Sequence, residues 1–165
     1  MKRYAITGPE SSGKTTLTQA LAKECDSIWT PEYAREYLMN LERPYEQQDL
    51  DQIASGQVNM WGQTSKNGMA FFDTEMTVMK VWSNYKYGNV SNHILDLLNN
   101  QHFDHYFLCR PDIMWEEDPL RENPEERDAL FEIYVKELTD LKVPYTIVGG
   151  SLPDRIAQCL EVINA

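Results

Sequence analysis

Cysteine is scarce in this sequence, and long apolar segments are missing. The three cysteines, Cys25, Cys109 and Cys159, form neither a C-x-x-C pair nor a zinc-binding spacing with histidine. An odd, scattered set is typical of free thiols in a reducing compartment. No apolar run approaches the roughly 20 residues that cross a bilayer, and Gly8 comes too early for the apolar region of a signal peptide. We therefore expect a cytoplasmic protein without a membrane span.

Cationic side chains are also few, with 15 Lys and Arg against 26 Asp and Glu and a formal net charge of -11. Nucleic acids and anionic lipids attract basic surfaces, so this balance predicts neither as a partner. A polyphosphate can still bind where a few cations and backbone N–H groups gather in one place. Internal repeats, low-complexity tracts and Gly/Ser linkers are absent, which predicts a single domain over residues 1–165.

Short β-prone runs alternate with helical patterns along the chain. This alternation predicts an α/β fold, with a five-stranded parallel sheet flanked by helices and a ligand at the carboxyl ends of the strands. The predicted strands cover residues 2–7, 27–30, 69–72, 106–109 and 145–148. The predicted helices start at residue 14, cover 33–41, 46–66, 76–86 and 91–100, and resume at 151 with a capping-box pattern, Ser151 and Asp154.

A phosphate-binding pattern lies between the first predicted strand and the first predicted helix. Residues 8–15, G-P-E-S-S-G-K-T, match G-x-x-x-x-G-K-[ST] at every fixed position. The two glycines let successive N–H groups point inward at an anion, and the following helix directs its positive end to the same place. The pattern predicts the P-loop NTPase fold. The predicted ATP-binding residues are Gly8, Glu10, Ser11, Ser12, Gly13, Lys14, Thr15 and Thr16.

A carboxylate that ends a buried strand is the second element expected at such a phosphate site. Asp73 directly follows the apolar run of residues 69–72 and is the natural candidate. A lone Asp in this position is often only a turn residue or a helix cap. Together with the phosphate-binding pattern, however, Thr15 and Asp73 predict a site for Mg²⁺, which accompanies ATP as the co-substrate.

Two further features favour ATP and a transfer reaction. The N-K-x-D segment of regulatory GTPases is absent, and a Gly pair at residues 149–150 suits either an adenine ring or an ordinary tight turn.

Residues 110–127 are rich in Pro and charge and are expected to form a mobile lid. Arg121 and Arg127, with Arg110 next, are expected to stabilise charge on the transferred phosphoryl group. The alternative is a solvated loop whose arginines pair with neighbouring glutamates.

A kinase also needs groups that orient and deprotonate an acceptor. The segment P-E-Y-A-R-E follows the second predicted strand, where Glu32 is a candidate base and Arg35 a candidate ligand for substrate or phosphate. A Glu at a helix start is also common for the helix dipole alone. The sequence leaves open whether Glu32 or Asp73 is the base. The predicted catalytic residues are Lys14, Glu32, Asp73, Arg121 and Arg127.

Five segments spread along the chain carry a family resemblance. They are I-T-G-P-E-S-S-G-K-T-T-L (6–17), P-E-Y-A-R-E-Y-L (31–38), F-F-D-T-E (71–75), K-V-W-S-x-Y-K-Y-G (80–88) and R-P-D-I-x-W-E-x-D-x-L-R-E-N-P-x-x-R (110–127). With these segments the chain closely resembles the ribosylnicotinamide kinase domain of the NadR family, one of the P-loop small-molecule kinases. The last two segments are much more specific than the phosphate-binding pattern, which many activities share.

The resemblance implies ATP-dependent phosphorylation of nicotinamide riboside at its 5′-hydroxyl, which yields nicotinamide mononucleotide for NAD synthesis. Trp82 and Trp115, with Tyr85 or Tyr87, would stack on the cationic pyridinium ring; the alternative is that both tryptophans belong to packed helix or lid structure. Asp112 and Glu75 would hold a ribose hydroxyl or the cationic base. The substrate-binding residues implied in this way are Tyr33, Arg35, Glu75, Trp82, Asp112 and Trp115.

The chain departs from full-length members of that family in one respect. It has only His93, His102 and His105, in no H-x-G-H arrangement, so the resemblance implies a stand-alone kinase domain that does not complete NAD synthesis by itself. Two alternatives remain open: a P-loop kinase for another nucleoside or small alcohol, and a nucleotide-dependent regulatory ATPase or switch protein. The sequence predicts no oligomeric state.

Overall fold

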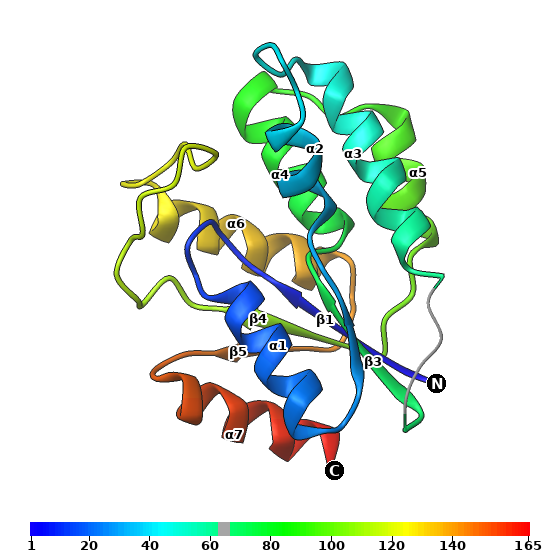
Figure 1. The fold of residues 1–165 in the computed structure, drawn as a ribbon, viewed down its shortest axis with the longest axis vertical. Coiled ribbons are helices and arrows are strands. Elements are labelled where there is room, and N and C mark those ends of the chain that lie inside the picture. Colours follow the sequence, from blue (N-terminus) through cyan, green and yellow to red (C-terminus); the bar gives the residue numbers. More distant parts are fainter. Residues whose placement is uncertain (63–66) are drawn as a thin grey trace.

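The computed structural model describes residues 1–62 and 67–165. These residues contain a five-stranded parallel sheet with the strand order β2-β3-β1-β4-β5 (Figure 1). The predicted parallel α/β fold is therefore confirmed, and each predicted strand starts or ends within one residue of the observed one. The strands are β1 (Lys2–Thr7), β2 (Ile28–Thr30), β3 (Met69–Asp73), β4 (His105–Cys109) and β5 (Tyr145–Val148).

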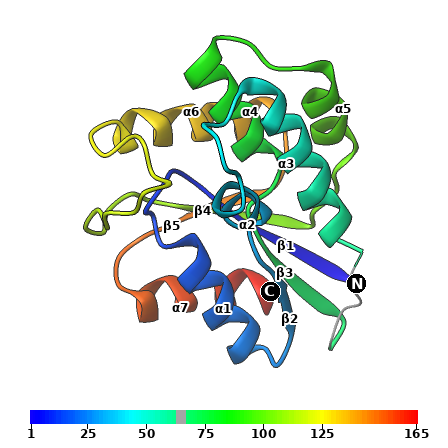
Figure 2. The ribbon, with the colours of Figure 1, turned by 45° about the horizontal axis from the view of Figure 1, so that its top comes forward.

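Helices cover both faces of the sheet, as Figures 1 and 2 show. On one face lie α1 (Lys14–Glu24) and α7 (Leu152–Ile163). On the other lie α2 (Tyr33–Met39), α3 (Gln47–Met60), α4 (Met76–Tyr87), α5 (Asn92–Asn100) and α6 (Arg127–Asp140). Within the described part of the chain, no helix has the length and apolar character that a bilayer span requires.

The central strands carry apolar side chains toward both helical layers. Ile6, Phe71 and Phe107 pack with Leu17 and Leu21 beneath α1 and α7. Successive strand residues face the opposite side, where Ala5, Phe72 and Leu108 pack with the buried residues of α3 to α6. Because a parallel sheet is covered on both faces, its strands are almost continuously apolar, which is why residues 69–72 were recognisable in the sequence.

Helix α6 is the main element that the sequence patterns did not predict. It begins at Arg127, the last residue of the predicted lid, and buries Leu130, Tyr134 and Leu138. Their spacing of four residues is helical, but it lies in a strongly charged stretch that masks it. Helix α3 ends at Met60, earlier than predicted. Trp61, at its C-cap, packs edge-on against Phe103. The last predicted residues of this helix, 63–66, lie outside the described residues.

The parallel register brings the polar strand ends to one edge of the sheet. Ile6 of β1 pairs with Asp73 of β3, and Thr30 of β2 pairs with Phe72 of β3. The phosphate-binding pattern after β1, Glu32 after β2 and Asp73 therefore lie at the same edge, as predicted for ligand sites of such sheets.

Replacing Gly56 with alanine tests the close packing of α3 on α2. A Cβ atom at Gly56 would lie 2.0 Å from Cε1 of Tyr33, so the two helices must separate. We expect Gly56→Ala to lower the free energy of unfolding by about 1–3 kcal/mol, despite the gain of about 0.5–1 kcal/mol that alanine normally brings to a helix. Urea denaturation measures this. Gly62→Ala is the control, because its Cβ meets Asn59 O at 3.9 Å; equal stability of both variants with wild type would contradict the prediction.

Candidate active site

The loop that joins β1 to α1, residues 8–15, has the curled backbone of an anion-binding nest, and we call it the phosphate loop. Gly8 has a φ of 139°, Ser11 of 53° and Gly13 of 84°. A Cβ atom at Gly8 would lie 2.9 Å from the Cys109 carbonyl oxygen, so only glycine fits there. Gly13 is the N-cap of α1 and contributes no capping side chain, which leaves the first N–H groups of the helix available to an anion.

Side chains of the phosphate loop hold its carbonyl groups. The Lys14 ammonium donates to the carbonyl oxygens of Gly8 at 2.9 Å and Pro9 at 3.0 Å. The Ser12 hydroxyl donates to the same Pro9 oxygen at 2.7 Å. The Pro9 carbonyl, which both side chains hold, belongs to the peptide that carries the Glu10 N–H, so these contacts fix the orientation of that N–H.

Asp73 lies beside the loop in an environment that opposes its charge. It is 1% exposed, its Oδ2 accepts a hydrogen bond from the Thr15 hydroxyl at 2.5 Å, and its Oδ1 is buried without a hydrogen-bond partner among the described residues. Burial raises the pKa of Asp73 to about 6, the negative charge of Glu32 adds to this, and the Thr15 hydrogen bond opposes it. An orphaned carboxylate oxygen next to a hydroxyl is the donor set that Mg²⁺ prefers.

These donors suit a metal that arrives with its nucleotide. Among the described residues no cluster of three or more His, Cys, Asp or Glu side chains could hold a metal ion alone. Mg²⁺ commonly binds one or two protein ligands and completes its octahedron with water and substrate phosphates. Thr15 and Asp73 together fit that arrangement.

A strained turn at Thr74 separates Asp73, the last residue of β3, from Glu75. Thr74 has a φ of 78°, which is costly for a β-branched residue. Its N–H donates to the Ile6 carbonyl at 3.0 Å, and its hydroxyl donates to Glu32 Oε2 at 3.2 Å. Thr74 therefore connects the ends of β1, β2 and β3. Sequence reasoning missed this residue, although its place between two acidic residues at a strand end was a usable indication.

A cavity of about 560 Å³ opens from the phosphate loop. Its size is typical of small-molecule sites. One wall consists of Glu32, Arg35 and Leu38, and another of residues from α4, including Trp82 and Lys86. The lid segment (residues 110–127) completes the enclosure with Ile113, Glu116, Leu120, Arg121, Glu122 and Asn123.

The lid segment rests directly on the phosphate loop. The Glu10 carboxylate accepts hydrogen bonds from the backbone N–H groups of Glu122 at 3.2 Å and Asn123 at 3.1 Å. The Arg127 guanidinium donates to the Ser11 carbonyl at 3.0 Å. Arg121 donates to the Glu116 carbonyl at 2.6 Å, within the lid itself.

The opposite side of the lid is tied to helices α2 and α4. Arg35 forms an ion pair of 2.8 Å with Asp118. Lys86 pairs with Glu122 at 2.9 Å, and the Tyr45 hydroxyl donates to the same Glu122 carboxylate. Asp118, Glu122 and Arg127 thus connect this segment to both sides of the cavity. The alternative weighed from sequence, a solvated loop whose arginines pair with neighbouring glutamates, describes Arg121, which lies 4.0 Å from the Glu116 carboxylate. It does not describe Arg127, which contacts the phosphate loop.

Several predicted site residues meet in this cavity. The phosphate loop residues and Thr16 line it together with Glu32, Arg35, Asp73, Trp82 and Arg121. Trp82 is held in place because its Nε1 donates to the Tyr45 hydroxyl at 3.1 Å. Neither Tyr45 nor the cavity-lining Lys86 was singled out from the sequence as a site residue.

Two predicted substrate ligands have structural partners instead. Glu75 is fully buried and does not line the cavity; it accepts hydrogen bonds from the Thr7 hydroxyl at 2.8 Å and from the N–H of Thr77 at 2.7 Å. It is the N-cap of α4, because the turn at Thr74 directs it into the interior. The Tyr33 ring lies against Gly56 of α3 and outside the cavity lining.

Asp112, Trp115 and Arg127 also lie outside the cavity lining. Asp112 accepts hydrogen bonds from Arg155 and from the N–H of Gly150, so it faces the β5–α7 loop. The Arg127 guanidinium lies 5.6 Å from the centroid of the Trp115 ring. Trp115 thus packs inside the lid segment, which was the structural alternative for this residue.

The raised pKa of Asp73 predicts a pH-dependent stability difference. The folded protein holds the Asp73 proton up to pH about 6, whereas an unfolded Asp releases it near pH 4, so stability falls as pH rises through this window. Asp73→Asn removes that loss. Between pH 5 and pH 8 we expect the variant to gain on the order of 1 kcal/mol relative to wild type.

Urea denaturation of the ligand-free protein at both pH values measures this gain. Asp96→Asn, on the exposed surface of α5, is the control and should show no such change. A constant difference between Asp73→Asn and wild type at the two pH values would contradict the raised pKa.

Comparisons with known proteins agree with this geometry. A family model described as "AAA domain" matches residues 3–155. The trifunctional NAD biosynthesis/regulator protein NadR of Salmonella typhimurium is 27% identical over 173 residues, covering 99% of this chain and 42% of that protein. The NadR protein of Escherichia coli is 26% identical with the same coverage. This chain therefore spans less than half the length of the curated relatives it matches.

Solved structures confirm the fold. A NadR protein in complex with NR superposes with a TM-score of 0.85 at 21% identity, over 99% of this chain and 50% of that one. Deoxyadenosine kinase from M. mycoides gives a TM-score of 0.69 at 17% identity, with 98% of each chain covered. The fold is thus that of P-loop kinases, the sequence is homologous to part of NadR, and the chain belongs to the AAA-domain family of P-loop proteins.

Proposed function

We propose that this chain is a single ATP-dependent kinase domain, over residues 1–165, that phosphorylates nicotinamide riboside to nicotinamide mononucleotide with Mg²⁺. The observation that carries the proposal is one cavity whose lining combines the phosphate loop, the Glu32 and Asp73 carboxylates, Trp82 and the lid segment. The homology to NadR, whose solved relative holds NR, supports the choice of acceptor. Three free cysteines favour a reducing, cytoplasmic location.

The nucleotide lies on the phosphate loop in this proposal. Backbone N–H groups and the Lys14 ammonium contact the β- and γ-phosphates, after Lys14 leaves the Gly8 and Pro9 carbonyls that it now contacts. Thr15 and Asp73 would hold Mg²⁺, which would supply positive charge opposite the phosphate oxygens. Its positive charge would also relieve the desolvated Asp73 carboxylate.

The geometry favours Glu32 over Asp73 as the base. Asp73 Oδ2 is occupied by the Thr15 hydroxyl, and the residue is buried. Glu32 is half-buried, lines the cavity and is oriented by Thr74. In the transfer step the acceptor oxygen bonds to the γ-phosphorus, the bond from that phosphorus to the β–γ bridging oxygen breaks, and the hydroxyl proton passes to Glu32. ADP leaves with the bridging oxygen.

Trp82 is the side chain that best suits a flat cationic ring. Its ring lines the cavity, and the hydrogen bond to Tyr45 fixes its orientation. Pyridinium cations bind well against aromatic faces. Glu122 of the lid lies on the same side and supplies a negative charge. Arg121, also lining the cavity, is placed on the lid where it can reach a transferring phosphoryl group after releasing the Glu116 carbonyl.

The fold likeness to deoxyadenosine kinase supports a second candidate, a kinase for another nucleoside. That likeness extends over nearly all of both chains, and aromatic stacking tolerates different bases. The cavity chemistry described above serves either acceptor, so the acceptor must be identified by experiment.

Acceptor-dependent ADP release from Mg-ATP is the test of this proposal. The assay compares nicotinamide riboside with a panel of ribo- and deoxyribonucleosides and identifies the product by mass. Strong stimulation by nicotinamide riboside, with mononucleotide formed, is expected. Preferential stimulation by a deoxynucleoside would support the second candidate. Slow ATP hydrolysis that no acceptor changes would contradict both and favour the nucleotide-dependent switch.

Glu32→Gln tests the assigned base. The substitution keeps the hydrogen-bond acceptor for Thr74 but removes the basic carboxylate, so we expect kcat to fall by about 10²–10⁴-fold while the Kd for Mg-ATP changes little. Glu36→Gln on the exposed side of the same helix is the control and should retain activity. An unchanged kcat for Glu32→Gln would transfer the role of base to Asp73.

A further inference from the structure

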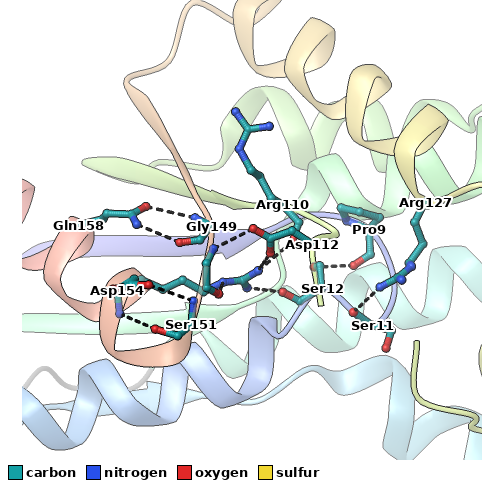
Figure 3. Close-up of polar contacts among 12 residues, drawn as sticks. Pro9, Ser11, Ser12, Arg110, Asp112, Arg127, Gly149, Ser151, Asp154 and Gln158 are labelled. Carbon is teal, nitrogen blue, oxygen red and sulfur yellow. Dashed lines mark hydrogen bonds and ion pairs between the residues drawn. The ribbon is translucent and has the colours of Figure 1, made fainter. Parts of the chain in front are cut away.

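Arg155 is a buried cation whose side chain contacts three loops at the phosphate-loop edge of the sheet. Figure 3 shows Ser12, Asp112 and Gly149, which belong to these three loops, close to one another. Arg155 lies in the first turn of α7 and is 3% exposed. Its Nη1 donates to the Ser12 carbonyl oxygen. Its Nη2 donates to the Arg110 carbonyl at 2.9 Å, and its Nε donates to the Gly150 carbonyl at 3.1 Å. The loops that follow β1, β4 and β5 are therefore joined through one guanidinium.

The carboxylate of Asp112 completes this arrangement. Its Oδ1 lies 2.5 Å from Arg155 Nη2, and its Oδ2 accepts the N–H of Gly150 at 2.7 Å. A Cβ atom at Gly149 would lie 2.7 Å from Asp112 Oδ2, so the β5–α7 loop approaches closely only because glycine stands there. Asp112 thus balances the charge of Arg155 and extends its contacts into this loop.

The contact with Ser12 acts within the phosphate loop itself. The Ser12 carbonyl and the Gly13 N–H belong to one planar trans peptide, so they point in opposite directions. Because Arg155 holds the carbonyl on the outer side of the loop, the Gly13 N–H is directed toward the interior. Arg155 also packs against Gly13, where an added Cβ would meet Nη1 at 3.0 Å.

A contribution to fold stability alone does not explain well why an arginine is buried at this position. A buried charge loses its hydration, and well-packed apolar residues often replace buried ion pairs without loss of stability. A guanidinium, however, offers five donors in a fixed planar fork. That geometry suits the fixing of several carbonyl groups relative to one another.

We propose that Arg155 is a positioning residue that orients the Ser12–Gly13 peptide toward the nucleotide polyphosphate and ties that peptide to the loops after β4 and β5. The inference rests on the proposed function, because it takes the phosphate loop as the nucleotide site. Arg155 touches no reacting atom in this role; it acts through the N–H of Gly13.

Binding of Mg-ATP and of magnesium tripolyphosphate to Arg155→Met tests this role. Methionine fills a similar volume and donates no hydrogen bond. We expect the Kd of both ligands to rise by a similar factor, about 10–100-fold, because the misplaced N–H faces the phosphates that they share. Arg155→Lys keeps the charge without the fork and should lie between wild type and the methionine variant.

Arg43→Met is the matched structural control. Arg43 forms two hydrogen bonds with Asp49, at 2.8 and 2.9 Å, away from the phosphate loop. The Arg43→Met substitution should lower the melting temperature without raising the Kd of either ligand. Each Kd is measured well below the melting temperature of the variant. If Arg155→Met does not fold, the same binding measurements are made with Arg155→Lys and Asp112→Asn. For each of these we expect a smaller rise in the Kd of both ligands.

The possible failures are distinguishable. Wild-type binding of both ligands together with unchanged binding by the Arg155 variants would overturn the positioning role alone. A rise in Kd for Mg-ATP without one for tripolyphosphate would also overturn it, since the effect would then act through the nucleoside side. A wild-type protein that binds neither ligand would overturn the proposed function and the inference with it.

Discussion

An anion nest requires N–H groups that remain unpaired until the anion arrives, and the structure around the phosphate loop follows from this constraint. The carbonyl groups of the loop accept hydrogen bonds from side chains of the loop itself and from side chains of two distant helices. Lys14 and Ser12 act from within the loop, Arg127 reaches the Ser11 carbonyl from α6, and Arg155 reaches the Ser12 carbonyl from α7. The contacts with the Pro9, Ser11 and Ser12 carbonyls fix the peptides that carry the N–H groups of Glu10, Ser12 and Gly13. The Gly8 carbonyl belongs to a peptide without an N–H, because Pro9 follows it.

Two residues on the acidic side of the site, Asp73 and Thr74, are held in energetically unfavourable states. Asp73 is desolvated with one oxygen unpaired, and Thr74 holds a backbone conformation that is unfavourable for a β-branched residue. The surrounding sheet maintains both, because β1, β3 and β4 are buried on two faces. Such local strain within a well-packed scaffold is common at functional sites.

The lid segment connects the two halves of the cavity. It contacts the phosphate loop through Glu10, and it contacts helices α2 and α4 through the Arg35–Asp118 and Lys86–Glu122 pairs. A change at either ligand position therefore reaches the lid by direct contacts. Ion pairs at partly exposed positions are individually weak, so each of these links contributes little stability by itself.

The sequence by itself determined the features whose chemistry lies within a few consecutive residues. The phosphate loop, the apolar strands with their polar ends, and the capping box at Ser151 and Asp154 were all predictable, because local backbone geometry and periodicity suffice for them. Only the tertiary structure decided the inward turn of Glu75 and the place of Arg155, which lies 143 residues from Ser12 in the chain. Contacts over such separations leave no periodic pattern in the sequence, because they depend on how the loops of different strands meet at one edge of the sheet.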